Sequence, residues 1–275
     1  MIFMSMRVIC FWNPTTAETK ILPQSNVPHP RHRSISLKIV DFGFDTRTSD
    51  YKVLRIFKYS SLDYKWDYLA EIYSLRDDTW RKVDITLNVL SFLSYKVPEY
   101  YPDNDYRGHT GASGTFHWWA NDHSGKDVIV SFDLSNEVFK TTGLPDAVNS
   151  CHSFRTIFSI NDYVALPLFV DYHVELWALL EYGVEKSWTK LFTIAFTLDT
   201  RRPLGFSKNG ELFFADGDGQ LLVWNPTTEA IGRIQVGGRV PWFSLQTVTY
   251  MESHIPLKGG NKLEDEQNSG DAIQS

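Results

Sequence analysis

The pentapeptide Trp-Asn-Pro-Thr-Thr occurs twice in this chain, at residues 12–16 and again at residues 224–228. Each copy follows an apolar run and precedes a segment containing isoleucine, which is typical of a strand that returns after a turn. Proline fixes φ at the second position of a type I turn, and the asparagine side chain before it bonds to the backbone just ahead. We therefore interpret the two copies as the same hairpin in two structural repeats.

Three further segments, residues 70–85, 128–145 and 173–194, follow the same strand-turn-strand plan with other turn residues. The turn markers are Pro14, Asp77, Ser135, Gly183 and Pro226, and subtraction of their numbers gives spacings of 63, 58, 48 and 43 residues. A propeller blade of four antiparallel strands takes about 40–50 residues, and loop insertions lengthen it. The spacing predicts an all-β, propeller-like chain of four-stranded antiparallel blades.

Short runs of β-branched and aromatic residues between turn signals place the strands of three blades. They are expected at residues 37–45, 51–57, 70–75 and 79–85; at 114–120, 127–134 and 138–144; and at 204–207, 211–215, 220–225 and 231–236. Tight turns are expected at Asn209-Gly210 and between Gly217 and Gly219, because Asn-Gly between apolar runs is a strong hairpin signal.

The N-terminal segment does not supply a complete four-stranded blade. Residues 7–12 correspond to the third strand of a blade, so two strands that should precede them are expected to be missing and the fold to be truncated at its N-terminus. Residues 245–251 then either close the ring against the first strand or leave an open edge. We expect one domain over residues 7–257, followed by a disordered acidic tail over residues 258–275, which has almost no apolar content.

Composition narrows the class of protein. Hydrophobic residues make up 43% of the chain and aromatic residues 15%, which suits a soluble domain with a full core. The net charge is −6, and residues 1–40 carry five Lys or Arg against one Glu, so the acidic excess lies in the rest of the chain. This balance argues against nucleic acid and for a basic partner. Two cysteines and no long apolar run indicate a cytosolic protein that does not enter a membrane.

Taken together, several segments resemble the F-box-associated domain of plant F-box proteins, which is a kelch-like β-propeller. The longest are Val-Ile-Cys-Phe-Trp-Asn-Pro-Thr-Thr (8–16), Asp-Phe-Gly-Phe-Asp-Thr-Arg-Thr-Ser-Asp-Tyr-Lys-Val-Leu-Arg-Ile (41–56) and Ala-Glu-Ile-Tyr-Ser-Leu-Arg-Asp-Asp-Thr-Trp-Arg (70–81). Shorter matches follow in order, at residues 114–120, 129–134, 175–177, 187–191 and 255–258. In detail they are similar to the S-locus F-box proteins of rosaceous and solanaceous plants.

The resemblance implies a role in target recognition for an SCF ubiquitin ligase. In that family an N-terminal F-box docks on the Skp adaptor of a cullin-RING ligase, and the β domain captures the target. S-locus members act in the pollen tube cytosol, in gametophytic self-incompatibility, and recognise basic S-ribonucleases. No helical F-box pattern precedes Arg7, so this chain is expected to lack the part that docks on the ligase.

Two segments are expected to bind the target, because tyrosine-rich and charged loops recur in recognition surfaces. One is residues 95–113, with Glu99, Tyr100, Tyr101, Asp103, Asp105, Tyr106 and Arg107; the other is residues 24–36, with His29, Arg31, His32 and Arg33. The alternative for the first is a solvated insertion without a role.

No arrangement of residues predicts an enzyme, a cofactor or a metal site. The glycine pair at Gly217 and Gly219 lacks the third glycine of a dinucleotide fingerprint, and His117 and His123 have no third ligand at a suitable spacing. A carbohydrate-binding or copper-oxidase-like propeller is the rival interpretation. Its glycan platform would be formed by Trp12, Trp80, Trp118, Trp119, Trp188 and Trp224, whose strand positions fit a core better.

Overall fold

The computed structural model describes residues 2–4, 9–85, 89–92, 109–110, 114–150, 157–160, 163–170, 173–195, 200–207, 209–235, 257 and 261–262. Its strands form antiparallel sheets, and nearly every strand pairs with its neighbour in the sequence. The first sheet has the order β1 (Ile2–Met4), β2 (Ile9–Asn13), β3 (Glu18–Ile21) and β21 (Asn261–Lys262). The second contains β4 (His32–Asp45), β5 (Asp50–Ser61), β6 (Trp66–Ser74) and β7 (Thr79–Val83) in chain order.

The remaining sheets repeat this plan. The third has the order β12 (Val138–Gly143), β11 (Asp127–Asp133), β10 (Thr115–Asp122) and β8 (Val89–Phe92), with β9 (His109–Thr110) also paired to β10. The fourth contains β13 (Phe158–Ile160), β14 (Tyr163–Val170), β15 (His173–Leu179) and β16 (Trp188–Ala195). The fifth contains β17 (Thr200–Phe206), β18 (Leu212–Asp216), β19 (Leu221–Trp224) and β20 (Ile231–Ile234). Two short 3-10 helices, η1 (Asp146–Ser150) and η2 (Glu185–Ser187), lie in connections.

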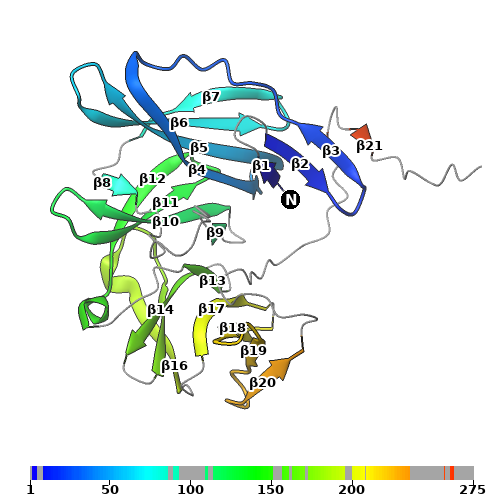
Figure 1. Ribbon diagram of the computed structural model, residues 1–275, viewed down its shortest axis with the longest axis vertical. Helices are drawn as coiled ribbons and strands as arrows, with labels where there is room; N and C mark the ends of the chain where they lie inside the picture. Colours follow the sequence, from blue (N-terminus) through cyan, green and yellow to red (C-terminus); the bar gives the residue numbers. More distant parts are fainter. Residues whose placement is uncertain are drawn as a thin grey trace, which may run out of the picture.

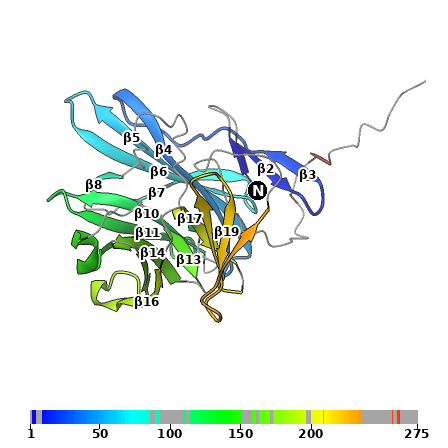
Figure 2. The same ribbon diagram turned by 60° about the horizontal axis from the view of Figure 1, so that its bottom comes forward.

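The sheets pack face to face in chain order, as Figures 1 and 2 show. Four hydrophobic clusters each join two consecutive sheets. Phe11 meets Tyr73 between the first and second sheets, and the cluster between the second and third sheets includes Leu54 and Phe132. Similar clusters join the third sheet to the fourth and the fourth to the fifth. Because each sheet buries its apolar faces against its neighbours, the architecture is that of propeller blades, as the repeat spacing predicted.

The repeated hairpin is confirmed. Asn13 Oδ1 accepts a hydrogen bond from the backbone N–H of Thr15 at 3.0 Å, and Asn225 Oδ1 accepts one from Thr227 at 2.9 Å. Each turn joins two paired antiparallel strands, β2 to β3 and β19 to β20, and each ends in a residue with positive φ, Ala17 and Glu229. The two copies of the pentapeptide therefore form equivalent turns, although β3 also pairs with β21, whereas β20 is the last described strand of its sheet.

The N-terminal register was wrong in one respect. β1 precedes residues 7–12 and pairs with β2, so one of the two positions expected to be empty is filled. Within the range expected to be a disordered tail, β21 pairs with β3, and Leu257 just before that range is buried. Residues 245–251, expected either to close the ring or to leave an open edge, lie outside the described part of the chain.

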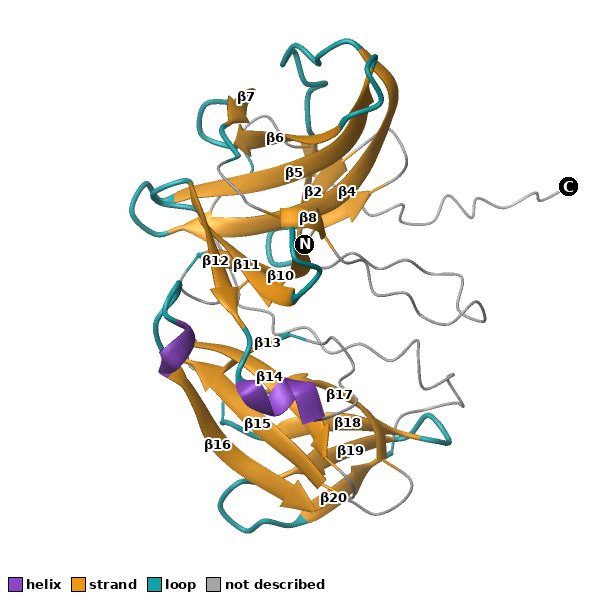
Figure 3. Cartoon of the chain, turned by 90° about the vertical axis from the view of Figure 1, so that its left-hand side faces the viewer, coloured by secondary structure: helices purple, strands orange, loops and turns teal. Residues whose placement is uncertain are grey.

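The second sheet also differs from prediction, because its strands are longer. β4 begins at His32 rather than at residue 37, and β5 continues to Ser61 rather than ending at residue 57. β6 begins at Trp66, four positions before the predicted start at residue 70. Figure 3 shows these strands curving away from the third sheet at the top of the molecule. This added length carries the candidate site.

Candidate functional site

The distal part of the second sheet, which we call the extension, consists of residues 32–38 of β4 and residues 57–69 of β5, β6 and their turn. Pairing between β5 and β6 continues to Ser60 and Trp66, whereas pairing between β6 and β7 stops at Ala70 and Val83. The turn closes with a hydrogen bond from Ser61 N–H to Lys65 O at 2.8 Å, and Tyr64 adopts a φ of 61°. The hairpin therefore extends past the end of β7, at the upper left of Figure 1.

Aromatic and cationic side chains meet on the extension. The guanidinium of Arg33 lies 3.9 Å from the ring centre of Tyr64. The Nζ atom of Lys58 lies 5.2 Å from the ring centre of Trp66 and 5.8 Å from that of Tyr68. These distances are typical of cation–π contacts. Tyr64 is 69% exposed and Trp66 60% exposed, so large rings are held at the surface by cations rather than by a core.

Lys58 lies in an electrostatically unfavourable position. Burial, and secondly the nearby charge of Lys38, lower the pKa of Lys58 from its ordinary value of 10.5. Both effects disfavour the charged ammonium. In the described part of the chain, no carboxylate lies within ion-pair distance of Arg33, Lys38 or Lys58. Arg33, Lys38 and Lys58 therefore place positive charge on the extension that no ion pair among the described residues neutralises.

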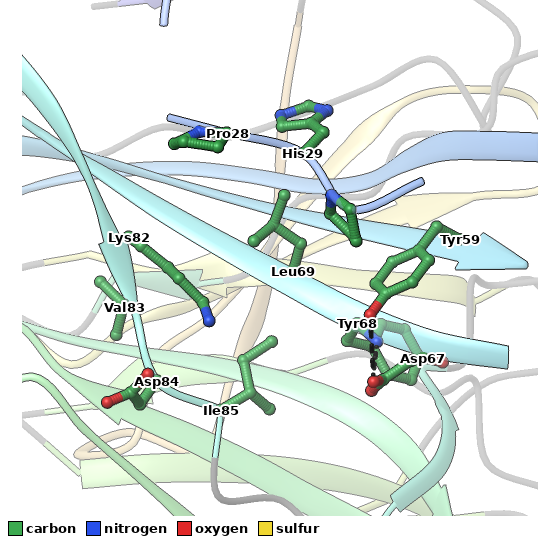
Figure 4. A pocket seen from close by; sticks show the side chains of 11 residues that line it. Pro28, His29, Tyr59, Asp67, Tyr68, Leu69, Lys82, Val83, Asp84 and Ile85 are labelled. Carbon is green, nitrogen blue, oxygen red and sulfur yellow. Dashed lines mark hydrogen bonds between the residues drawn. The ribbon is translucent and has the colours of Figure 1, made fainter. Parts of the chain in front are cut away.

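A pocket of about 660 Å³ opens beside the extension, between the segment before β4 and the strands β5 to β7. Its lining residues are Pro28, His29, Pro30, Tyr59, Asp67, Tyr68, Leu69, Lys82, Val83, Asp84 and Ile85. Figure 4 shows Tyr59 donating its hydroxyl to Asp67, at 3.1 Å, while Lys82 and Asp84 approach from the β7 side. The wall is mixed in character, with prolines and aliphatic side chains between charged ends.

His29 anchors the segment that covers this pocket. Its Nε2 atom bonds to Oε1 of Glu71 at 2.7 Å, and its ring packs against Phe57 with 5.2 Å between centres. Glu71 is completely buried and also accepts a hydrogen bond from Arg55, whose guanidinium lies 3.7 Å from the ring centre of Trp80. A buried carboxylate is stable only when it is paired in this way. His29 is therefore a positioning residue.

The predicted binding residues have different outcomes. His29 and Arg31 lie in the segment before β4, as expected, whereas Arg33 lies in β4 itself, so the prediction of a loop through residue 36 was wrong there. Arg31 is exposed, and Arg33 contributes to the cation–π contact described above. Glu99, Tyr100, Tyr101, Asp103, Asp105, Tyr106 and Arg107 lie outside the described residues.

Sequence reasoning missed Lys58, Tyr64, Trp66 and Tyr68. They lie in residues 58–69, between two predicted strands, where the aromatic residues alternate with charged and polar ones. The alternation at Tyr64-Lys65-Trp66-Asp67-Tyr68 was a usable strand signal. It was overlooked because neither face of such a strand carries an aliphatic core.

The six tryptophans of the rival glycan platform do not form a surface. Five of them are at most 8% exposed, and Trp12 is partly buried. The five are Trp80, Trp118, Trp119, Trp188 and Trp224. Of the two histidines weighed as ligands, His117 is buried and its Nδ1 atom bonds to Ser131 Oγ at 2.9 Å. These findings agree with the predicted core role of these residues.

The part of the chain that the structure describes contains no group of three His, Cys, Asp or Glu side chains able to hold a metal ion. Among its helices, none is long and apolar enough to cross a bilayer.

Consecutively packed antiparallel sheets of this kind define a β-propeller-like domain. The family model for the F-box associated beta propeller domain matches residues 1–238, so the chain belongs to this family. The F-box protein CPR1 of Arabidopsis thaliana is 28% identical over 236 residues, which cover 78% of this chain and 56% of that protein. The F-box protein At4g22390 of the same plant is 25% identical over 233 residues, 78% of this chain and 57% of that protein.

The chain spans about half the length of these curated relatives, 56% and 57%. Among solved structures, apo AztD from Citrobacter koseri aligns with a TM-score of 0.35 and 13% identity, over 88% of this chain and 73% of that one.

Proposed function

We propose that this domain is the target-recognition part of an F-box protein, the specificity subunit of an SCF ubiquitin ligase. The role is binding rather than catalysis. The observation that carries the proposal is membership of the F-box associated β-propeller family over residues 1–238. The exposed rings and unneutralised cations of the extension support it, because aromatic and arginine side chains at the surface are enriched where proteins bind one another.

The proposal is tested by attaching the chain to a ligase. The chain is fused behind an F-box and expressed in plant cells, and proteins that co-purify with it are assayed for ubiquitination by the reconstituted ligase. We expect at least one co-purifying protein to be ubiquitinated with the F-box fusion and not with the chain alone. If nothing co-purifies beyond what an unrelated acidic propeller captures, the proposal is wrong.

A narrower proposal makes the protein an S-locus type that binds a basic S-ribonuclease in the pollen tube cytosol. It is supported by the sequence resemblance and by the acidic excess beyond residue 40, since complementary charge accelerates encounter. Surface plasmon resonance with immobilised style ribonucleases tests it. Binding no stronger than that of an equally acidic unrelated propeller rejects the ribonuclease as target and leaves the broader role intact.

A further inference from the structure

Most of the extension lies outside the clusters that join the second sheet to its neighbours. The clusters that join the second sheet to its neighbours use residues nearer its centre, such as Ile39, Ile56 and Ala70, and Tyr68 touches their border. Beyond these positions residues 62–67, in the turn and at the start of β6, are exposed, and Leu62 is 55% exposed. Exposed large apolar side chains grouped at one place commonly mark an interaction site.

Arg55 shows what a complete cationic site looks like in this protein. Its guanidinium lies against the ring of Trp80 and donates a hydrogen bond to the carboxylate of Glu71. Arg33 has the ring of Tyr64 and Lys58 has the ring of Trp66, but no described carboxylate accompanies either of them. At these two exposed sites the cation contacts an aromatic ring but has no ion-pair partner among the described residues. A carboxylate of a bound protein would supply that partner.

Repulsion between two nearby lysines also favours an anion at this site. Lys38 and Lys58 repel each other, and an anion placed between them would remove that penalty. The pairing between β4 and β5 gives the distance that such a ligand has to span. Lys58 is opposite Ser36, and Arg33 lies three positions before Ser36, at the irregularity in pairing between His32 and Ser34. Three positions correspond to about 10 Å along a strand. In an extended segment the side chains on one face recur every second residue, about 7 Å apart, so carboxylates two or four residues apart bracket this separation.

We propose that the extension binds an extended acidic segment of a target protein, with carboxylates at Arg33 and Lys58 and an apolar side chain against Trp66. The inference rests on the proposed function and deepens it by assigning the chemistry of the target. The ligand proposed here is acidic, whereas the narrower proposal names a basic target. The two differ because the extension carries a local positive charge, whereas the whole chain carries a net negative charge. Single-stranded nucleic acid also suits cations and rings, but the net charge of −6 repels a polyanion of that length.

The test uses three fluorescein-labelled probes and fluorescence anisotropy. The first is the peptide Ser-Glu-Asp-Phe-Asp-Glu-Leu-Glu-Ser, the second has Gln or Asn in place of every acidic residue, and the third is a nine-base oligothymidylate. The intact chain is compared with the double variant Arg33→Gln and Lys58→Gln, and with Trp66→Ser. The matched control is Lys126→Gln with Lys186→Gln, which removes two exposed lysines from the connections between strands of other sheets.

We expect the acidic peptide to bind at least tenfold more tightly than its neutral counterpart and than the oligothymidylate. The double variant should weaken this binding tenfold or more, Trp66→Ser severalfold, and the control by less than twofold. Circular dichroism verifies that every variant folds. Equal binding of the acidic and neutral peptides, tighter binding of the oligothymidylate, or equal losses in the double variant and the control would each overturn the proposal.

The outcomes also separate this inference from the proposed function. If co-purifying targets survive the double variant unchanged, the extension is not their site, although target recognition stands. If the acidic peptide binds as expected but no protein co-purifies with the chain, the site is real and the ligase role fails.

Discussion

Lys52 joins the second and third sheets, and its replacement by methionine should destabilise the protein strongly. Its side chain is only 7% exposed, and its Nζ atom donates to Asp45 Oδ2 at 2.7 Å, Leu134 O at 2.9 Å and Glu137 Oε1 at 3.1 Å. Asp45 lies on β4, whereas Leu134 and Glu137 belong to the hairpin between β11 and β12. One ammonium therefore connects two blades.

The loss in unfolding free energy can be worked out from the group that loses its ion-pair partner. Methionine fills a similar volume, but the fully buried carboxylate of Asp45 loses its cation. Removing one partner of a buried ion pair costs about 3–5 kcal/mol. Asp45 keeps hydrogen bonds from Ser135 Oγ at 2.5 Å and from Thr48 Oγ1 at 2.6 Å, which places the loss near the lower end, at about 3 kcal/mol.

Urea titration followed by tryptophan fluorescence measures this loss as a decrease in the free energy of unfolding. The matched control is Lys190→Met, because Lys190 also forms an ion pair, at 2.9 Å with Glu175, but its side chain is 45% exposed. An exposed pair contributes about 0–1 kcal/mol. If Lys52→Met costs no more than Lys190→Met, the contact does not connect the blades energetically and the reasoning is refuted.

Three other outcomes are expected. Burial raises the pKa of Asp45, but hydrogen bonds from Lys52, Ser135 and Thr48 outweigh it and hold the pKa well below 3.8. The stabilisation from ionised Asp45 is therefore complete above pH 3.8 and is lost as the pH falls below that value. The difference in unfolding free energy between the intact chain and Lys52→Met should be smaller at about pH 3 than at about pH 6, and a constant difference would contradict this linkage. Gly114→Ala should cost more than 1 kcal/mol in urea titration, because Gly114 has a φ of +72° and a Cβ there would lie 3.0 Å from Phe44 O; an unchanged midpoint would count against this backbone conformation. Trp66→Ala should change the free energy of unfolding little, because Trp66 is exposed. Trp80→Ala removes a buried ring and a hydrogen bond to Pro23 O at 2.8 Å, so it should lower the free energy of unfolding by about 3–5 kcal/mol. Equal losses in urea titration would show that Trp66 belongs to the core.

The sequence predicted the parts of this fold that depend on local turn chemistry. Asn13 and Asn225 bond to their own turns, and Gly210 and Gly219 take positive φ where the Gly signals placed tight turns. These features depend on a few adjacent residues, so a single sequence shows them.

The extension could not be predicted in the same way, because its strands follow from pairing rather than from burial. Residues 32–36 of β4 have little apolar periodicity, and they become a strand because β5 continues opposite them. Its binding character depends on Arg33 meeting Tyr64, which is 31 positions away by subtraction, and that contact has no local signal.

Hydrogen–deuterium exchange of the chain with and without a co-purified target protein tests the central claim most directly. Binding should slow exchange in peptides covering residues 32–38 and 57–69, while exchange in the hairpins of the fourth and fifth sheets stays unchanged. Protection confined to those other sheets, with the extension exchanging as fast as in the free protein, would contradict it.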